Sequence, residues 1–303
     1  MACPWLLQQL YELGPYSPWL NGYKAQEPPN GWKMRVNVSE DRTSALSDDD
    51  VDKFVSAHMS GVPWVEFRSC RWGMTSMRKV WNLLLEFGMT RLWDWKNVEA
   101  VLQDLRAQDP RAEELNRLKG VKAAVEKCVS IYESGQKRSP NGRIKLMLPV
   151  LNEAKFHFYL YVLQVSDRGF ELTRYDSMGS LGNASCREDC ATELLRWLCS
   201  RVYPAAEFLY TEAVKAVAQG HDLSCGAFTC AYALLDALDL GALHTQLDHQ
   251  NVRDVYALIE NFFRACETSI RNSTVKSGVV GFDANDQPMR ILHTQHGECI
   301  DLT

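Results

Sequence analysis

The sequence lacks any run of 18 apolar residues, the length that a membrane-spanning helix requires. Its first residues, Met1 to Leu7, carry no basic charge before a short apolar stretch, so they lack the pattern of a secretory signal peptide. We therefore expect no membrane partner. We expect an intracellular protein, cytoplasmic or nuclear, and delivery into a host cell is also compatible with this sequence.

A strong excess of charge is absent too. A net charge of −5 over 303 residues gives no sign of a nucleic-acid-binding surface. Cysteine is too sparse for a disulfide scaffold, because ten residues are only about three per hundred. Cys186, Cys190 and Cys199, taken with His221, fit no common zinc spacing. We expect a monomer without a metal or organic cofactor.

What the sequence does contain is a cysteine where a polar loop becomes an apolar helix. The loop that begins at Gln219 leads into Cys225, Gly226 and a strongly apolar run. A cysteine at a helix N-terminus lies among free backbone N–H groups at the positive end of the dipole, which favours the nucleophilic thiolate. Gly226 permits close backbone approach beside the sulfur, and the Gln219 amide can donate to the same oxyanion. A buried structural thiol is the alternative interpretation of Cys225.

A base for this nucleophile is expected on a hairpin upstream. Two apolar, aromatic-rich runs, 144–152 and 156–163, and an alternating run, 169–175, predict neighbouring strands. Residues 167–169 supply a turn between the last two. If these two strands pair, His157 at the start of one lies across the ladder from Asp176 at the end of the other. The carboxylate then holds one imidazole nitrogen while the other faces the sulfur.

Other residues could take these roles. His221 is an alternative base, and Asp222 is an alternative orienting group, since both lie just before the cysteine. A ring fixed within the same short turn rarely points across the sulfur, so we favour His157. His157 could also merely end a strand, and Asp176 could cap a turn.

The order His157, Asp176, Gln219, Cys225-Gly226 resembles that of the cysteine proteases specific for ubiquitin-like modifiers, the SUMO-deconjugating Ulp-type family related to adenovirus proteinase. Segments 148–152, 46–55 and 249–256 resemble this family's strand before the histidine, its early "WLxD" helix entry and its closing helix. The resemblance covers roughly residues 40–265. It implies an α+β fold of the papain-like and adenain-like kind, in which helices flank a mixed central β-sheet.

The resemblance also implies an activity. The protein would be a thiol protease or isopeptidase that cleaves after the C-terminal glycine of a ubiquitin-like modifier, with SUMO favoured. His157, Asp176 and Cys225 would form the triad. Gln219 and the backbone N–H of Cys225 would stabilise the oxyanion.

Substrate contacts are expected at Asp48, Phe158 and Gly226. Three positions depart from the family pattern. Ser224 replaces the aspartate before the cysteine, Phe158 replaces the tryptophan after the histidine, and Leu46 replaces the tryptophan of the early motif. Phe158 can still form an apolar lid over the channel for the modifier's Gly-Gly tail. These changes bear on the choice of modifier more than on activity.

Alternative functions stay open at this point. The protein could deconjugate ubiquitin or the neddylation modifier, or it could acetylate proteins with the same triad, as some bacterial effectors on this scaffold do. It could also be a non-catalytic module that binds a modifier.

The sequence divides into an N-terminal extension (1–43), a protease domain (44–265) with a helical insertion at about 70–140, and a tail (266–303). We expect the insertion to lie beside the active site, where it could contact the modifier or substrate protein. Ser47 is expected to cap a helix with an acidic first turn. Further helices are predicted over 74–89, 95–134 with a break at Asp109-Pro110, 186–201, 225–238 and 252–266. A short strand is predicted over 206–210, and 279–282 and 290–292 could be short strands or ordered extensions.

Overall fold

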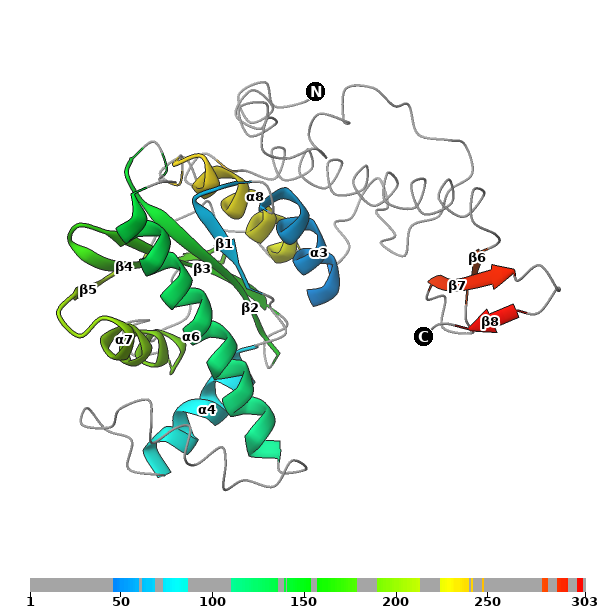
Figure 1. Ribbon diagram of the computed structural model, residues 1–303, viewed down its shortest axis with the longest axis horizontal. Helices are drawn as coiled ribbons and strands as arrows, with labels where there is room; N and C mark the ends of the chain where they lie inside the picture. The colour runs from blue at the N-terminus through cyan, green and yellow to red at the C-terminus, as the bar shows by residue number, and fades with distance from the viewer. Residues whose placement is uncertain are drawn as a thin grey trace.

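The computed structural model describes residues 46–59, 62–68, 73–86, 110–135, 139, 141–153, 157–178, 190–212, 224–239, 241, 247, 280–282, 288–293 and 299–301 (Figure 1). The N-terminal extension, the expected helices over 95–109 and 252–266, and most of the tail lie outside these residues. No helix of the described segments is both long enough and apolar enough to cross a membrane.

The centre of the molecule is a five-stranded mixed sheet with the strand order β1-β2-β3-β4-β5. The strands are β1 (Val65–Phe67), β2 (Ile144–Asn152), β3 (His157–Ser166), β4 (Gly169–Asp176) and β5 (Glu207–Glu212). The inner three are antiparallel, and each outer strand runs parallel to its neighbour. The predicted mixed sheet of an α+β protein is therefore confirmed.

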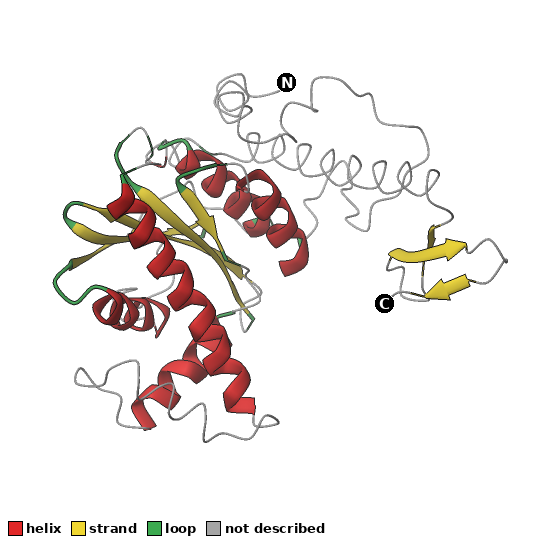
Figure 2. Cartoon of the chain, viewed as in Figure 1, coloured by secondary structure: helices red, strands yellow, loops and turns green. Residues whose placement is uncertain are grey.

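Helices cover both faces of this sheet (Figures 1 and 2). One face carries α3 (Asp48–Met59) and α8 (Cys225–Ala237), and the other carries α4 (Met74–Glu86), α6 (Pro110–Ser134) and α7 (Cys190–Val202). Because both faces are covered, β3 is buried along almost its whole length, from His157 to Val165.

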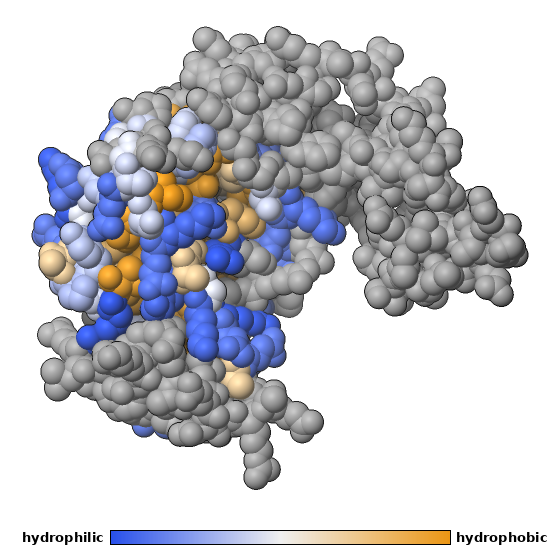
Figure 3. Space-filling model, viewed as in Figure 1, coloured by the Kyte–Doolittle hydropathy of each residue, from blue (hydrophilic) through white to orange (hydrophobic). Residues whose placement is uncertain are grey.

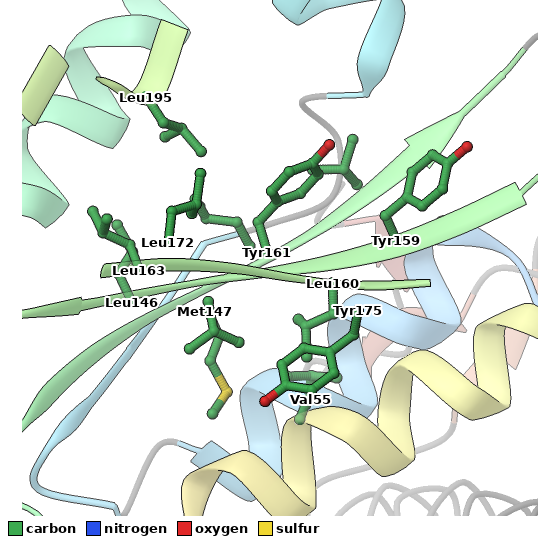
Figure 4. Packing of buried hydrophobic residues seen from close by; sticks show 14 of the residues in the cluster. Val55, Leu146, Met147, Tyr159, Leu160, Tyr161, Leu163, Leu172, Tyr175 and Leu195 are labelled. Carbon is green, nitrogen blue, oxygen red and sulfur yellow. The ribbon is translucent and has the colours of Figure 1, made fainter. Parts of the chain in front are cut away.

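Alternate strand residues fill two separate apolar layers (Figure 4). Leu163 and Leu172, which are paired across β3 and β4, point toward Leu195 of α7. Leu160 and Tyr175, which are also paired, point toward Val55 of α3 and toward α8. The sheet is thus the middle layer of three.

The helices of the 70–140 stretch belong to this core. Along α6, Leu115, Leu118, Val125 and Cys128 are fully buried at helical spacing, and α6 packs on β2 and β3. Hydrophilic side chains run along the outer surface of α6 in Figure 3. The stretch therefore supplies α4 and α6, which share one layer of the fold with α7.

Helix α3 begins with the predicted cap. The Asp50 N–H donates to Ser47 Oγ at 3.1 Å, and the Ser47 N–H donates to the Asp50 carboxylate at 3.1 Å. This reciprocal pair is a capping box, which satisfies backbone donors at the helix start.

The tail contains a second, antiparallel sheet of three strands, β6 (Val280–Phe282), β7 (Pro288–His293) and β8 (Cys299–Asp301). Two of them coincide with 279–282 and 290–292, for which short strands are one of the two expectations from the sequence.

Candidate active site

The β3–β4 hairpin forms about the predicted turn, with Gly169 at φ +108°. A side chain at Gly169 would also lie 2.4 Å from the backbone oxygen of Glu207 in β5, so both the turn and the strand pairing require glycine here.

The register of the hairpin differs from the expected one. Asp176 lies opposite Tyr159, and His157 is paired with Asn152 of β2. His157 and Asp176 are therefore diagonal neighbours rather than direct partners. The physical reason is the turn, which is centred one position later in the chain than a direct pairing of these two residues would require.

The diagonal relation still brings the two side chains together. His157 Nε2 lies 2.8 Å from Asp176 Oδ1, and both residues are buried. The Met178 backbone N–H donates to the same Oδ1 at 3.0 Å. An aspartate that accepts from the backbone and from one ring nitrogen fixes the orientation of the imidazole.

Cys225 is the first residue of α8, directly after Ser224 at the N-cap position. The His157 ring is within hydrogen-bonding reach of the Cys225 side chain. Because Nε2 faces Asp176, Nδ1 is the nitrogen left for the thiol. A helix N-terminus favours negative charge on the sulfur.

The surroundings of His157 shift its protonation equilibrium. Burial lowers the pKa of His157, but the hydrogen bonds and negative charges of Asp176 and Cys225 outweigh burial and raise this pKa to about 9. The imidazole is therefore protonated at neutral pH.

The three residues meet at one end of the sheet. Tyr175 stacks on Tyr232 of α8, with ring centroids 5.2 Å apart, so its neighbour Asp176 points to the opposite face. His157 can nevertheless reach Cys225, because His157 begins β3, Asp176 ends β4 and Cys225 begins α8. Each residue lies at the end of its element, so the three side chains meet at this end of the sheet.

No family model and no curated protein sequence matches the chain. Several solved structures do match the chain. SUMO protease Ulp1 with its catalytic cysteine oxidised to a sulfonic acid shares 10% identity over 86% of this chain and 95% of its own, with a TM-score of 0.46. The Ulp1-like SUMO protease catalytic domain of Chaetomium thermophilum shares 17% identity over 72% and 74%, with a TM-score of 0.40. The effector RickCE of Rickettsia bellii shares 14% over 74% and 97%, with a TM-score of 0.37.

In fold, the chain resembles the Ulp1-type proteases.

The remaining site residues predicted from the sequence have different positions. Gln219, like His221 and Asp222, lies outside the described residues. Phe158 is buried and belongs to the hydrophobic core, one residue along β3 from His157. Asp48 is the first residue of α3.

Gly226 has a packing role. A Cβ at this position would lie 2.9 Å from the Cβ of Leu46, which is itself buried. Glycine therefore lets the segment before α3 pack directly against the first turn of α8. This contact brings the helix start with Asp48 beside the helix start with Cys225.

Three further cysteines, Cys128, Cys199 and Cys230, lie in the hydrophobic core. Burial raises the pKa of Cys128 to about 12 and raises those of Cys199 and Cys230. They are inert structural thiols. In the described part of the chain, no group of three or more histidine, cysteine or acidic side chains is arranged to hold a metal ion.

A polar cluster at the far end of α8 does not follow from the sequence pattern. Lys145 of β2, only 2% exposed, lies 2.7 Å from carboxylate oxygens of both Asp236 and Asp239. Tyr175 donates to the other Asp236 oxygen at 2.5 Å. We call these four residues the Lys145 cluster. These contacts link the C-terminal end of α8 to the sheet. In the sequence, the only indication of the cluster is a lysine within an apolar strand.

Proposed function

We propose that this protein is a cysteine peptidase that cleaves after the C-terminal glycine of a ubiquitin-like modifier, with SUMO favoured. The observation that carries the proposal is the buried contact of 2.8 Å between His157 and Asp176, with Cys225 at a helix N-terminus beside the same imidazole. A structural cysteine needs neither a base nor an orienting carboxylate.

In the first half of the reaction, the Cys225 thiolate attacks the carbonyl carbon of the modifier's terminal glycine. A C–S bond forms, and the carbonyl electron pair moves to oxygen. The backbone N–H of Cys225 donates to this oxyanion, as does Gln219 in the role that its sequence position suggests. The tetrahedral intermediate then collapses and the C–N bond breaks. The leaving lysine amine takes its proton from the His157 imidazolium.

In the second half, the neutral imidazole accepts a proton from water, and the resulting hydroxide attacks the thioester carbon. The C–S bond breaks, the modifier leaves with a free carboxylate, and the thiolate–imidazolium pair is restored. A histidine protonated at neutral pH, as a pKa of about 9 requires, can donate to the amine in the first half.

The substrate class rests on the sequence resemblance in the order His157, Asp176, Gln219, Cys225-Gly226. The C-terminal Ulp1 protease domain has been solved in complex with Smt3, the yeast ortholog of SUMO, so SUMO is the first modifier to test. Phe158 and Leu46 replace two tryptophans of the family pattern, and both are buried in the core of this structure.

The test is covalent trapping with modifiers that carry a C-terminal electrophile. SUMO, ubiquitin and the neddylation modifier are each incubated with wild type, Cys225→Ala and His157→Ala, and adducts are resolved by mass. Cys190→Ala is the matched control, because Cys190 is a partly exposed cysteine on α7, a different helix. We expect wild type and Cys190→Ala to form an adduct with SUMO, and Cys225→Ala to form none.

Two other results would change the proposal. An adduct with ubiquitin or the neddylation modifier alone would keep the peptidase and change its substrate. No adduct with any probe, from folded protein, would contradict the proposal. Acetylation of a target protein that requires acetyl-CoA would then identify an acyltransferase.

A further inference from the structure

The candidate base His157 and three other side chains form a closed ring of contacts. Asp176 contacts His157 through Oδ1 at 2.8 Å and Arg174 through Oδ2 at 3.2 Å. The Arg174 guanidinium lies over the Tyr159 ring, 4.9 Å from its centroid. The Tyr159 ring in turn meets the His157 ring edge-on, with centroids 4.9 Å apart. Each member therefore touches two others.

The register of the hairpin builds this ring. Tyr159 is paired with Asp176, while His157 and Arg174 lie two residues from these on their own strands, so all four side chains are on one face of the sheet. All four are also buried, and Arg174 is only 6% exposed. Burying a guanidinium is costly unless it is paired, so its position is fixed by Asp176 and Tyr159.

Arg174 completes the hold on the carboxylate. Oδ1 accepts from His157 and from the Met178 backbone, and Oδ2 accepts from Arg174. With both oxygens occupied, the carboxylate cannot rotate about its own axis without losing a charge-assisted bond. The same cation, acting through space, opposes a second positive charge on the His157 ring.

We propose that Arg174 is a positioning residue of the active site: it fixes the carboxylate of Asp176 and, with Tyr159, the plane of the His157 imidazole. This inference rests on the proposed function, since it assigns a role within the same site. Besides Arg174, the ionisable groups that face the His157–Asp176 pair within the part of the chain that the structure describes are Cys225 and Tyr232 on α8 and Tyr159 on β3. Arg174 thus brings to this pair a permanent positive charge, which none of these three side chains can supply.

The test needs no modifier, so its outcome is independent of the substrate assignment. The rate of Cys225 carbamidomethylation by iodoacetamide is followed by mass spectrometry from pH 4 to 10, and the His157 ring signal is titrated by NMR, assigned with His157→Ala. We expect Arg174→Gln to raise the His157 pKa by roughly one unit, because a positive charge is removed. We expect the alkylation rate at neutral pH to fall roughly tenfold, because the imidazole loses its fixed orientation.

The matched control is Arg196→Gln. Arg196 also pairs with a carboxylate, Glu193 at 2.6 Å, and also lies over an aromatic ring, that of Phe208 at 5.5 Å, but it is on α7. We expect neither the His157 titration nor the alkylation profile to change in this variant.

Arg174→Lys separates charge from geometry. It keeps the positive charge, so the His157 pKa should return close to its wild-type value. An ammonium cannot both contact Asp176 and lie flat over Tyr159, so alkylation should remain slower than wild type, by about threefold. If Arg174→Gln folds and leaves both profiles unchanged, the inference is wrong. If Arg174→Gln does not fold, Arg174→Lys decides, and a wild-type alkylation rate in that variant would overturn the inference.

Discussion

At the scale of single residues, one imidazole connects two elements that are distant in sequence. His157 contacts Asp176 on the neighbouring strand and Cys225 on a helix from the other face of the sheet. Its pKa of about 9 means that the ring carries its second proton at neutral pH. In the reaction proposed above, the proton that the leaving amine takes would therefore be present before substrate binds.

This raised pKa predicts how stability depends on pH. In the unfolded chain the histidine has an ordinary pKa of 6.5, and in the folded protein it has a pKa of about 9. Between these values the folded state holds a proton that the unfolded state has lost. The stabilising contribution is therefore complete below pH 6.5, falls as pH rises toward 9, and is absent above it. We expect the free energy of unfolding in urea to fall more steeply over this window for wild type than for His157→Gln. Parallel curves would contradict the raised pKa.

The residue types of the site could be predicted because few side chains serve as nucleophile, base or orienting carboxylate, and here they stand at the ends of recognisable elements. Arg174 and Lys145 could not. A charged residue at an alternating strand position indicates a solvent-exposed face. In this fold both sheet faces are covered, so both cations are buried: Lys145 against Asp236, which only the tertiary structure brings near, and Arg174 against Asp176 of its own strand.

At the scale of elements, two helix starts lie side by side. The Leu46–Gly226 contact places the beginning of α3 against the first turn of α8, where the candidate nucleophile lies. This close packing is possible because Gly226 has no side chain. Movement of the first turn of α8 would also move Cys225 relative to His157.

Substitution of this glycine tests the packing. We expect Gly226→Ala to lower the free energy of unfolding by about 1–3 kcal/mol, because its Cβ would overlap that of Leu46. Gly120→Ala is the matched control. Gly120 lies within α6, and a Cβ added there would meet no atom within 4 Å, so alanine should stabilise by about 0.5–1 kcal/mol through helix propensity. Urea denaturation measures both, and a Gly226→Ala variant as stable as wild type would mean that α3 adjusts freely.

Loss of the capping box is expected to have a smaller effect on the free energy of unfolding. Ser47→Ala removes the hydroxyl that accepts from the Asp50 N–H, so it should cost about 1 kcal/mol of unfolding free energy. Ser56→Ala, on the exposed side of the same helix, should change stability by less than about 0.5 kcal/mol. Thermal or urea denaturation of the two variants compares them directly, and equal effects would argue against the cap.

Elements with strong periodicity can be predicted, and those without it cannot. The β3–β4 hairpin follows from its alternating residues and its turn. Strand β1 does not, because three residues, Val65 to Phe67, are too few to show a period, and its partner β2 begins nearly eighty positions later. Because β1 pairs with β2 in parallel, no tight turn connects the two strands, and the sequence contains no turn signal for this pairing.

At the scale of the whole molecule, α8 is held at both ends. Its first residue meets the hairpin end of the sheet, and its last turn meets the Lys145 cluster. The Trp64 indole N–H also donates to the Ala237 carbonyl at 2.8 Å. Because both ends are fixed, the helix has little freedom to slide along the sheet, and the position of Cys225 is set by contacts at a distance.

Two separate substitutions test how much the Lys145 cluster contributes to stability. Tyr175→Phe removes one donor to buried Asp236 and should cost about 1–3 kcal/mol of unfolding free energy. Lys145→Met leaves Asp236 and Asp239 without their cation and should cost about 3–5 kcal/mol. Tyr203→Phe, at an exposed tyrosine, is the control and should be nearly neutral. If both core variants match this control in urea denaturation, the cluster contributes no stability.

The chain order of the site has a consequence for biosynthesis. His157 and Asp176 are only 19 residues apart and share one hairpin, whereas α8 ends at Ala237, 61 positions after Asp176. A ribosome therefore releases the base and its carboxylate well before the helix that carries the thiol can dock. Until α8 docks, the histidine has no sulfur beside it, and the thiol lacks the ion pair that would activate it. Reactivity of the candidate thiol should thus arise late and in one step, when α8 docks.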